Sequence, residues 1–411
     1  MTSFAPYIRF IRDNAPYLAV GALLSFLSSF GQTFLIAAFA GEIRTEYGLS
    51  NGDWGLIYMV ATMVSAGVMI FAGGLTDRFR ARSISVVVLA CLALSCLAMA
   101  LNTHVIGLFI IIFCLRFFGQ GMTSTISIVS ISRWFIATRG RALAISTVGF
   151  VTAEAILPLS SVWLKSYLPW RIIWVGFAGF ILVMIPVIWR LLKLERTPQA
   201  TTKADNSAGM DDKHWTRAQA LRHPLFWTLA PTMALFPMFA TTFWFHQVHF
   251  AEIKGWEHLN LVAVFPFGTF TFMGSTFLFG WAVDKFGAGR LLPIYLLPYS
   301  AAFIIHAFAP TIAWTAFGVI LMGLAGGGQA TLPGSVWSTY FGTAHIGSIK
   351  SAAVALMVLG SAIGPGMSGW LIDIGVGFET QLLFYSATFV IGSVAMIPAL
   401  RAATARLPAT P

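Results

Sequence analysis

The chain has 411 residues, of which 57% are apolar and 14% aromatic, and its mean hydropathy is +0.80. A water-soluble fold of this length cannot bury so much apolar surface, so the composition predicts an integral membrane protein. The formal charge of +10 does not indicate a nucleic-acid-binding protein, because the Lys and Arg residues fall between apolar runs and form no basic domain.

Apolar runs of about 20 residues, the length that crosses a hydrocarbon core, predict the transmembrane helices. Six such runs precede the polar segment 193–223 and six follow it, and the Thr, Asp, Lys and Gly content of that segment indicates a linker. We therefore expect an all-α membrane protein with an N-terminal half 1–192, a cytoplasmic linker 193–223 and a C-terminal half 224–411. The twelve predicted spans are 17–41, 54–75, 83–101, 105–132, 141–165, 171–192, 224–249, 260–283, 290–309, 312–341, 348–373 and 379–400.

The basic residues predict the orientation, since loops rich in Lys and Arg stay on the cytoplasmic side of a membrane. If both termini are cytoplasmic, 20 of the 25 Lys and Arg residues fall on that side. We expect a multi-pass protein of the cell membrane, inner or plasma, with both termini in the cytoplasm.

A constant offset of 207 residues relates the two halves, as expected after a gene duplication. Each half contains six predicted spans, so the two copies have parallel topology and are expected to be related by an axis along the membrane normal. The matched positions are Gly48 and Gly255, Asp77 and Asp284, Gly121 and Gly328, Gly140 and Gly347, Pro158 and Pro365, and Trp163 and Trp370.

The loop after the second span, GGLTDRFRAR at 73–82, has a repeat in GWAVDKFGAGR at 280–290, and both contain G-x-x-x-D-[RK]-F. This loop resembles the signature of the major facilitator superfamily, G-x-L-x-D-R-x-G-R-R. Arg80 and Ala81 depart from the pattern, at a glycine and a basic position. The resemblance implies the twelve-helix, two-half major facilitator fold and a cytoplasmic latch between the halves. The alternative is that the arginines only anchor the loop to the cytoplasmic surface. The expected gating residues are Gly73, Asp77, Arg78, Arg82, Gly280 and Asp284.

Other segments extend the resemblance along the chain. LRFFGQGMTS in the fourth span matches the superfamily's arginine motif through Arg116, Gly119 and Gly121. The phrases SFGQTFLIAAFAGEIRTEYGLS, WFHQVHFAEIKGW and LPWR look most like the branch that holds oxalate/formate-type and monocarboxylate porters.

Charged residues inside the spans are the first candidates for solute or proton handling, because an ionised group there is costly without water or a partner. Arg116 and Gln120 are four residues apart and share a helix face, whereas Glu154 precedes Pro158 by four residues in the fifth span. We interpret these three residues as lining a central cavity. A structural Arg116–Glu154 pair that no solute touches is the alternative.

Three further polar residues are predicted to line this cavity. Gln32 lies on a polar stripe of the first span, His246 near the outer end of the seventh, and Gln329 in the glycine-rich tenth. A metal site is not expected, since His246 and His249 have no third ligand and the three cysteines lie in apolar runs without motif spacing.

The sequence lacks an enzyme constellation and a Walker motif, so we expect a non-enzymatic secondary transporter without cofactors. The predicted solute is a small organic anion, moved by alternating access with proton coupling or by exchange, through a functional monomer. Proton-driven export of neutral or drug-like compounds and nitrate-type transport are the alternatives. A non-transporting receptor is disfavoured because no long soluble extension is present.

Overall fold

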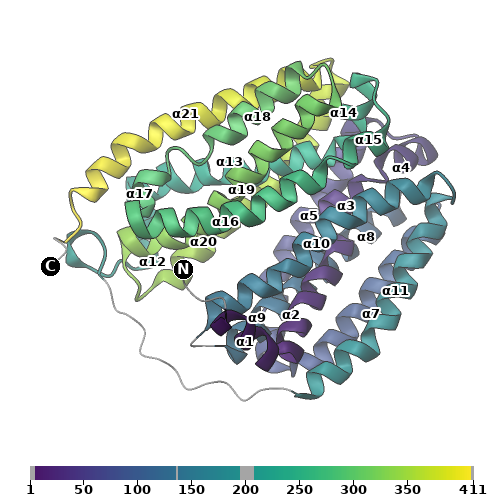
Figure 1. Ribbon diagram of the computed structural model, residues 1–411. Helices are drawn as coiled ribbons and strands as arrows, with labels where there is room; N and C mark the ends of the chain where they lie inside the picture. Colours follow the sequence, from purple (N-terminus) through teal and green to yellow (C-terminus); the bar gives the residue numbers. More distant parts are fainter. Residues whose placement is uncertain (1–4, 136–137, 195–207, 409–411) are drawn as a thin grey trace. The chain divides into compact units, whose positions relative to one another are not determined.

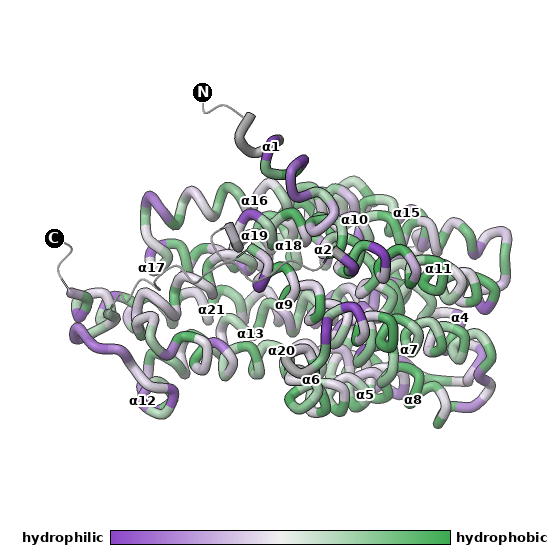
Figure 2. Tube along the Cα trace, turned by 90° about the horizontal axis from the view of Figure 1, so that it is seen from below, coloured by the Kyte–Doolittle hydropathy of each residue, from purple (hydrophilic) through white to green (hydrophobic). Residues whose placement is uncertain are grey.

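The computed structural model describes residues 5–135, 138–194 and 208–408, and every regular element in these ranges is a helix (Figure 1). Contacts divide the chain into two compact units. Unit 1 comprises Met1–Leu49 and Val60–Lys203, and unit 2 comprises Ser50–Met59 and Ala204–Pro411. In Figure 2 the bodies of the helices are mostly hydrophobic and the hydrophilic residues gather at their ends.

Ten helical stretches in the described ranges are long and apolar enough to cross a membrane. Two further apolar stretches, Ala15–Gly31 and Leu297–Phe308, are shorter. The chain is therefore a multi-pass membrane protein. The ten stretches are Asn51–Ala72, Ala81–Leu101, Val105–Trp134, Gly140–Lys165, Trp170–Leu191, Pro224–Phe245, His258–Phe286, Ile312–Phe341, Ile346–Asp373 and Phe378–Thr404.

The helices of unit 1 pack in two main pairs, α2 with α10 and α7 with α11. The contacts of Ala22 with Gly149 and of Ala38 with Lys165 show that the chain through α2 runs parallel to α10, whereas α7 and α11 are antiparallel, with Arg82 near Trp189 and Ala100 near Arg171. Helix α5 (Asn51–Ala72) is shared, with its residues up to Met59 in unit 2 and the rest in unit 1. The other elements of unit 1 are α1 (Ala5–Asp13), α2 (Ala15–Ser28), η1 (Ser29–Gly31), α3 (Thr33–Ala37), α4 (Ala40–Tyr47), α6 (Leu75–Arg78), α7 (Ala81–Leu101), α8 (Val105–Cys114), the π-helix η2 (Leu115–Thr123), α9 (Ser124–Trp134), α10 (Arg139–Lys165), α11 (Trp170–Leu191) and η3 (Leu192–Leu194).

The first predicted span, 17–41, is not one continuous helix. It breaks at Gln32, whose backbone is extended, before α3 restarts at Thr33. At this break Gly31 lies directly against the backbone of η2, where a Cβ would come within 2.0 Å of the Leu115 carbonyl oxygen and 2.9 Å of the Gly119 Cα. A backbone contact this close requires glycine.

In unit 2 the main pairs are α16 with α19, α13 with α20 and α18 with α21. Its elements are η4 (Met210–Asp212), α12 (Arg217–Arg222), α13 (Pro224–Phe245), α14 (Gln247–Lys254), α15 (His258–Val262), α16 (Phe265–Phe286), α17 (Ala288–Leu291), α18 (Leu297–Phe308), α19 (Ile312–Phe341), α20 (Ile346–Asp373) and α21 (Phe378–Thr404).

The predicted span 290–309 is also interrupted, because residues 292–296 form turns between α17 and α18. Pro293 and Pro298 explain this break, since a proline lacks the N–H group that a continuing helix needs.

The first residues of α5 pack inside unit 2 against α20. A Cβ on Gly55 would lie 2.8 Å from the Pro365 carbonyl oxygen, and the Gly52 amide donates to Asp373. The ring of Trp54 stacks on Phe245 at 5.5 Å. Small residues thus let these two helices approach at backbone distance.

The offset of 207 residues recurs in the helix boundaries. Gly48 and Gly255 end α4 and α14 in the same left-handed conformation, with φ of 63° and 67°. The helix starts that differ by 207 are Ala40 and Gln247, Asn51 and His258, Ala81 and Ala288, Val105 and Ile312, and Arg139 and Ile346. The duplication seen in sequence is therefore also a duplication of local structure.

The second part of the predicted linker has a defined fold, whereas residues 195–207 lie outside the described ranges. Asp211 forms an ion pair with Arg406, which also contacts His223 at 3.0 Å. The Arg406 guanidinium lowers the pKa of the Asp211 carboxyl through its hydrogen bond. Thr216 begins α12 with a capping box. The segment from Gly209 to His223 is therefore tied to the end of unit 2.

We predict that Gly31→Ala lowers the thermal unfolding midpoint of the detergent-purified protein, because the added methyl group meets the Leu115 carbonyl. Overpacking of this kind costs about 1–3 kcal/mol. Gly176→Ala in α11 is the control, since a Cβ there meets nothing within 4 Å. Equal midpoints for the two variants would contradict the proposed backbone contact.

Candidate functional site

Arg116 lies in η2, in the middle of the long stretch Val105–Trp134, and binds the break in the first span. Its Nη1 donates to the Gly31 carbonyl at 3.0 Å and to the Thr33 hydroxyl at 3.4 Å, and the residue is only 2% exposed. An interrupted helix in a membrane needs new partners for its freed carbonyls, and Arg116 supplies one. The contact brings Arg116 to the backbone beside Gln32.

The helix around Arg116 is widened to the π form, which the sequence analysis did not predict. The Thr123 hydroxyl donates to the Phe118 carbonyl, five residues earlier. Gln120 lies in this segment, half-buried, and its carbonyl accepts a hydrogen bond from the Ser124 hydroxyl. π-Helical turns inside α-helices are frequent at functional sites.

Glu154 lies in α10, four residues before Pro158, and is half-buried. In the described parts of the chain its carboxylate makes no hydrogen bond or ion pair, whether with Arg116 or with another residue. Because Pro158 has no N–H, the backbone carbonyl of Glu154 also lacks its usual helical donor. Glu154 thus combines an unpaired carboxylate with a local gap in the helix hydrogen bonds.

Gln32 lies between η1 and α3, at the extended point of the break in the first span, and is half-buried. Closer to the start of α2, the hydroxyls of Ser25, Ser127 and Ser146 lie 3.0–3.2 Å apart and join α2, α9 and α10. These serines satisfy one another, whereas no partner is found for the Gln32 side chain among the described residues. Within unit 1, Gln32 is therefore a second half-buried polar side chain, after Glu154, without a partner among the described residues.

The two candidates in unit 2 both have protein partners. His246, at the turn between α13 and α14, is 3% exposed and its Nε2 lies 3.1 Å from the Pro365 carbonyl oxygen. Gln329 in α19 accepts a hydrogen bond from the Tyr295 hydroxyl at 2.9 Å and donates to the Met357 sulfur at 3.3 Å. Tyr295 comes from the turns that interrupt the ninth predicted span.

The predicted gating loops are described only in part, because the side chains of Asp77 and Arg78 lie outside what the structure describes. Gly73 precedes α6, and its carbonyl accepts a hydrogen bond from the Thr76 hydroxyl. The repeat residues Gly280 and Asp284 lie in α16, where Asp284 is exposed. The latch between halves therefore stays a prediction.

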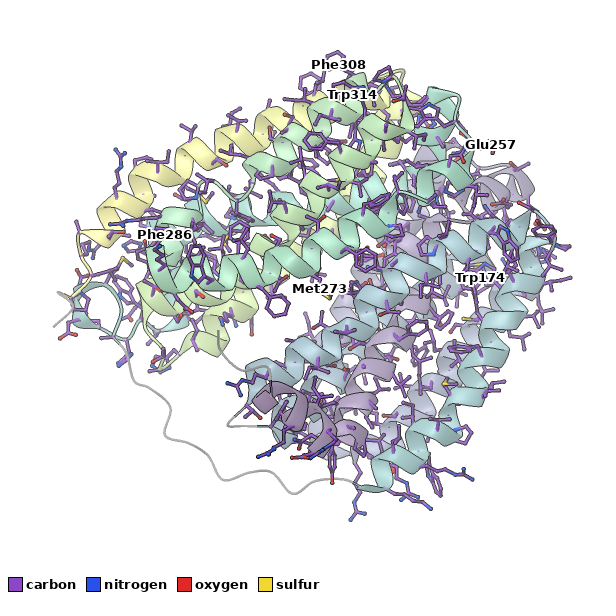
Figure 3. The ribbon with its side chains drawn as sticks, in the orientation of Figure 1. Trp174, Glu257, Met273, Phe286, Phe308 and Trp314 are labelled. Carbon is purple, nitrogen blue, oxygen red and sulfur yellow. The ribbon has the colours of Figure 1, made fainter. Side chains whose placement is uncertain are left out.

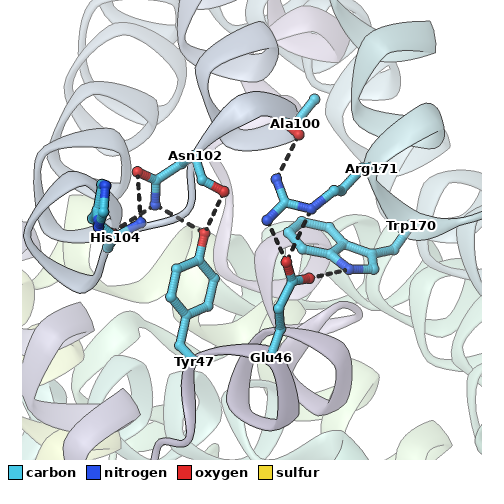
Figure 4. Close-up of polar contacts among 7 residues, drawn as sticks. All are labelled: Glu46, Tyr47, Ala100, Asn102, His104, Trp170 and Arg171. Atoms are coloured by element: carbon cyan, nitrogen blue, oxygen red, sulfur yellow. Dashed lines mark hydrogen bonds and ion pairs between the residues drawn. The ribbon is translucent and has the colours of Figure 1, made fainter.

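Two ion pairs that could not be predicted from sequence join helix ends in equivalent places of the two units. In unit 1, Arg171 on α11 pairs with Glu46 on α4 and donates to the Ala100 carbonyl at the end of α7, at 2.6 Å (Figure 4). Trp170 donates to the same carboxylate at 3.0 Å. We call Glu46, Arg171 and the Ala100 carbonyl clamp 1.

Clamp 2 consists of Lys254, Glu379 and the Ala307 carbonyl. Lys254 on α14 pairs with Glu379 on α21 at 2.7 Å and donates to Ala307 at the end of α18, at 2.8 Å. Ala100 and Ala307 are 207 residues apart, so the two clamps cap the same carbonyl of the repeat. Their charges are inverted, since α4 supplies the carboxylate in clamp 1 and α14 supplies the cation in clamp 2.

The Arg171 hydrogen bond to Glu46 lowers the pKa of that carboxyl below its ordinary value of 4.5, against the opposing effect of burial. A carboxyl whose pKa is lowered in the folded state contributes stability above its unfolded pKa and loses it as the pH falls through the folded value. Clamp 1 is therefore present at neutral pH and weakens only in acid below about pH 4.5.

We predict that Glu46→Arg and Arg171→Glu each lower the unfolding midpoint, and that the double variant recovers most of the loss because it adopts the polarity of clamp 2. A partly exposed pair and one lost carbonyl bond together amount to about 1–2 kcal/mol. The measurement is thermal unfolding in detergent at pH 7. The exposed pair Arg12 and Asp13 provides the control Arg12→Glu, and additive losses in the double variant would refute the clamp.

Comparisons with known proteins agree with this helical architecture. The sequence profile described as Major Facilitator Superfamily matches residues 21–365. Two proteins called Multidrug resistance protein B homolog, from two strains of Mycobacterium tuberculosis, are 29% identical over 93 residues, which are 23% of this chain. The match spans only 17% of the length of these curated relatives.

Solved structures show a similar fold at low sequence identity. A bacterial homolog of the human lysosomal transporter Spinster, inward-facing and unoccupied, is 16% identical with a TM-score of 0.72, over 97% of this chain and 99% of that one. The nucleoside transporter NupG is 13% identical with a TM-score of 0.67, over 95% and 100%.

Proposed function

Because the chain belongs to the Major Facilitator Superfamily, we propose that this transporter moves a small organic solute by alternating access and that Glu154 is its proton site. A transporter of this family is not an enzyme. The proposal keeps the predicted arrangement of twelve spans in two halves, with both termini in the cytoplasm of a cell membrane, and a functional monomer.

The observation that carries the proposal is the unpaired carboxylate of Glu154. A carboxylate inside a membrane span is costly unless it faces water or a partner, so its presence there favours a functional role. Its repeat position is Ser361, and α20 retains the proline of this helix at Pro365. The proline is common to both copies, whereas the carboxylate occurs in one, which supports a task in transport over one in folding.

The contacts of Arg116 favour a neutral or cationic solute over an organic anion. Its guanidinium donates to Gly31 and Thr33 and is buried. These bonds use Nη1 alone, but the side chain is only 2% exposed, so an anion would need its surroundings to rearrange before it could reach the cation. A solute that interacts with Glu154 and Gln32 needs neither a negative charge nor a rearrangement of the break. The names of the relatives, a multidrug resistance protein and a nucleoside transporter, fit this solute class.

In the proposed cycle, Glu154 exchanges a proton as access alternates between the two sides. A carboxyl group can hold a proton in one state and release it in the other, which couples solute movement to a pH gradient. The loops at 73–82 and 280–290 would open and close the cytoplasmic side.

We predict that Glu154→Gln abolishes uptake or efflux driven by a pH gradient in proteoliposomes but leaves solute exchange without a gradient, because the amide cannot release a proton. The assay compares a lipophilic cation, a nucleoside and a monocarboxylate. Glu257→Gln is the matched control, since Glu257 is an exposed carboxylate before α15 (Figure 3). Undiminished gradient-driven transport by Glu154→Gln would refute the proton site.

The organic anion remains the second candidate solute, because Arg116 is a cation in the middle of a span. If an anion binds there, Arg116→Ala loses carboxylate transport and Arg116→Lys retains part of it. If Arg116 only holds the break, both variants unfold at lower temperature and the protein transports no carboxylate even with Arg116 present.

A further inference from the structure

Two cations contact one tryptophan at the end of unit 1 where α7 begins and α11 ends. The guanidinium carbon of Arg82 and the ammonium nitrogen of Lys193 each lie 4.0 Å from the centroid of the Trp189 ring. Arg82 is in the first turn of α7, Trp189 in the last turn of α11, and Lys193 in η3 directly after it. These two contacts thus place two positive charges beside one indole, where α7 packs against α11.

These cations have no acidic partner in the described parts of the chain. Arg82 and Lys193 form no ion pair or side-chain hydrogen bond there, and their chain neighbours Arg80 and Arg190 are exposed cations. Each cation–aromatic contact is worth about 0.5–1 kcal/mol at an exposed site. Since both cations contact the same ring, an anion bound beside Trp189 would lie near two positive charges.

Helix packing does not require this arrangement, because unit 2 lacks it. The positions 207 residues later are Gly289, Met396 and Leu400, none of which is charged or aromatic. Met396 and Leu400 lie in α21, which packs against α18 as α11 packs against α7, whereas Gly289 lies in α17, ahead of the turns that precede α18. The cluster is therefore an addition to one copy of the repeat, and a ligand explains it better than the fold does.

The position at the end of two spans favours a lipid as the ligand. Tryptophan and Arg or Lys side chains concentrate at the membrane surface, and the anionic headgroups of the cytoplasmic leaflet attract basic residues there at about 1 kcal/mol each. The predicted orientation places this end on the cytoplasmic side. We propose that Arg82, Trp189 and Lys193 bind the phosphate group of an anionic phospholipid.

The site is independent of the transported solute, so it is tested by lipid binding. Wild-type protein in nanodiscs of phosphatidylcholine with increasing phosphatidylglycerol is compared with the double variant Arg82→Gln, Lys193→Gln. Native mass spectrometry counts the phosphatidylglycerol molecules that stay bound after extraction. We expect the double variant to lose one tightly held lipid, with an affinity about 10- to 30-fold weaker, as two contacts of this strength imply.

Two control variants test whether lipid binding depends on the positive charges at this particular site. Lys285→Gln removes a single cation near Trp281 and Phe286 in unit 2, at 5.1 and 5.3 Å from the ring centroids, and should leave the count unchanged. Arg82→Lys keeps the charge and should retain the lipid. If the double variant does not fold, the wild type still tests the site, because the retention of phosphatidylglycerol must weaken at high salt.

The source of the phosphate is tested by competition. Millimolar inorganic phosphate or glycerol phosphate should not displace the lipid, because neither adds the acyl chains that keep a headgroup at the membrane surface. Displacement by soluble phosphate, or equal retention of phosphatidylglycerol by the wild type and the double variant, would overturn the lipid site.

Discussion

The structure depends on satisfying backbone carbonyl groups where helices break or end within a membrane. Water cannot replace a lost helical bond in the hydrocarbon region, so a side chain has to provide the donor. In this chain long cationic side chains do so repeatedly. Arg116 donates to Gly31 at the break in the first span, Lys165 donates to Ala38 at 2.7 Å just before α4, and Arg133 donates to Thr76 at 2.9 Å in α6. In the two clamps, Arg171 and Lys254 likewise donate to the carbonyls at the ends of α7 and α18.

Because cations bind backbone carbonyls in this chain, a charged side chain within a span is not by itself evidence of a solute-binding site. A charge within a span is by default a candidate for solute binding, and on that basis Arg116 and Glu154 were equivalent candidates. Their surroundings differ, since Arg116 is buried with backbone and hydroxyl partners whereas Glu154 is half-buried without one in the described chain. An arginine such as Arg116 can donate to free backbone carbonyls and so stabilise the fold. A carboxylate such as that of Glu154 only accepts hydrogen bonds, and it finds few donors in a helix whose N–H groups are already bonded.

Sequence alone predicted the helical class and the approximate spans, because hydropathy is a property of short sequence windows, and it predicted the duplication because the same residues recur at a constant offset of 207. It did not predict the break at Gln32 or the π-helix around Arg116. Both depend on how closely two backbones approach, as Gly31 and Gly119 do, and no local pattern contains that distance. The clamp partners were missed for a similar reason. Glu46 and Arg171 are 125 residues apart, and each alone is indistinguishable from an ordinary charge at the membrane surface.

The inverted polarity of the two clamps has an evolutionary consequence. When the two halves are aligned at the offset of 207, Glu46 corresponds to Ile253 and Arg171 corresponds to Phe378. The charged residues of clamp 2, Lys254 and Glu379, each come one residue later. A comparison of aligned side chains would therefore report that neither half preserved the other's ion pair. What persisted is the carbonyl acceptor, at Ala100 and Ala307. Since each pair closes inside its own copy, compensating substitutions could accumulate in one copy without any change in the other. Co-variation between Glu46 and Arg171 should then be independent of co-variation between Lys254 and Glu379.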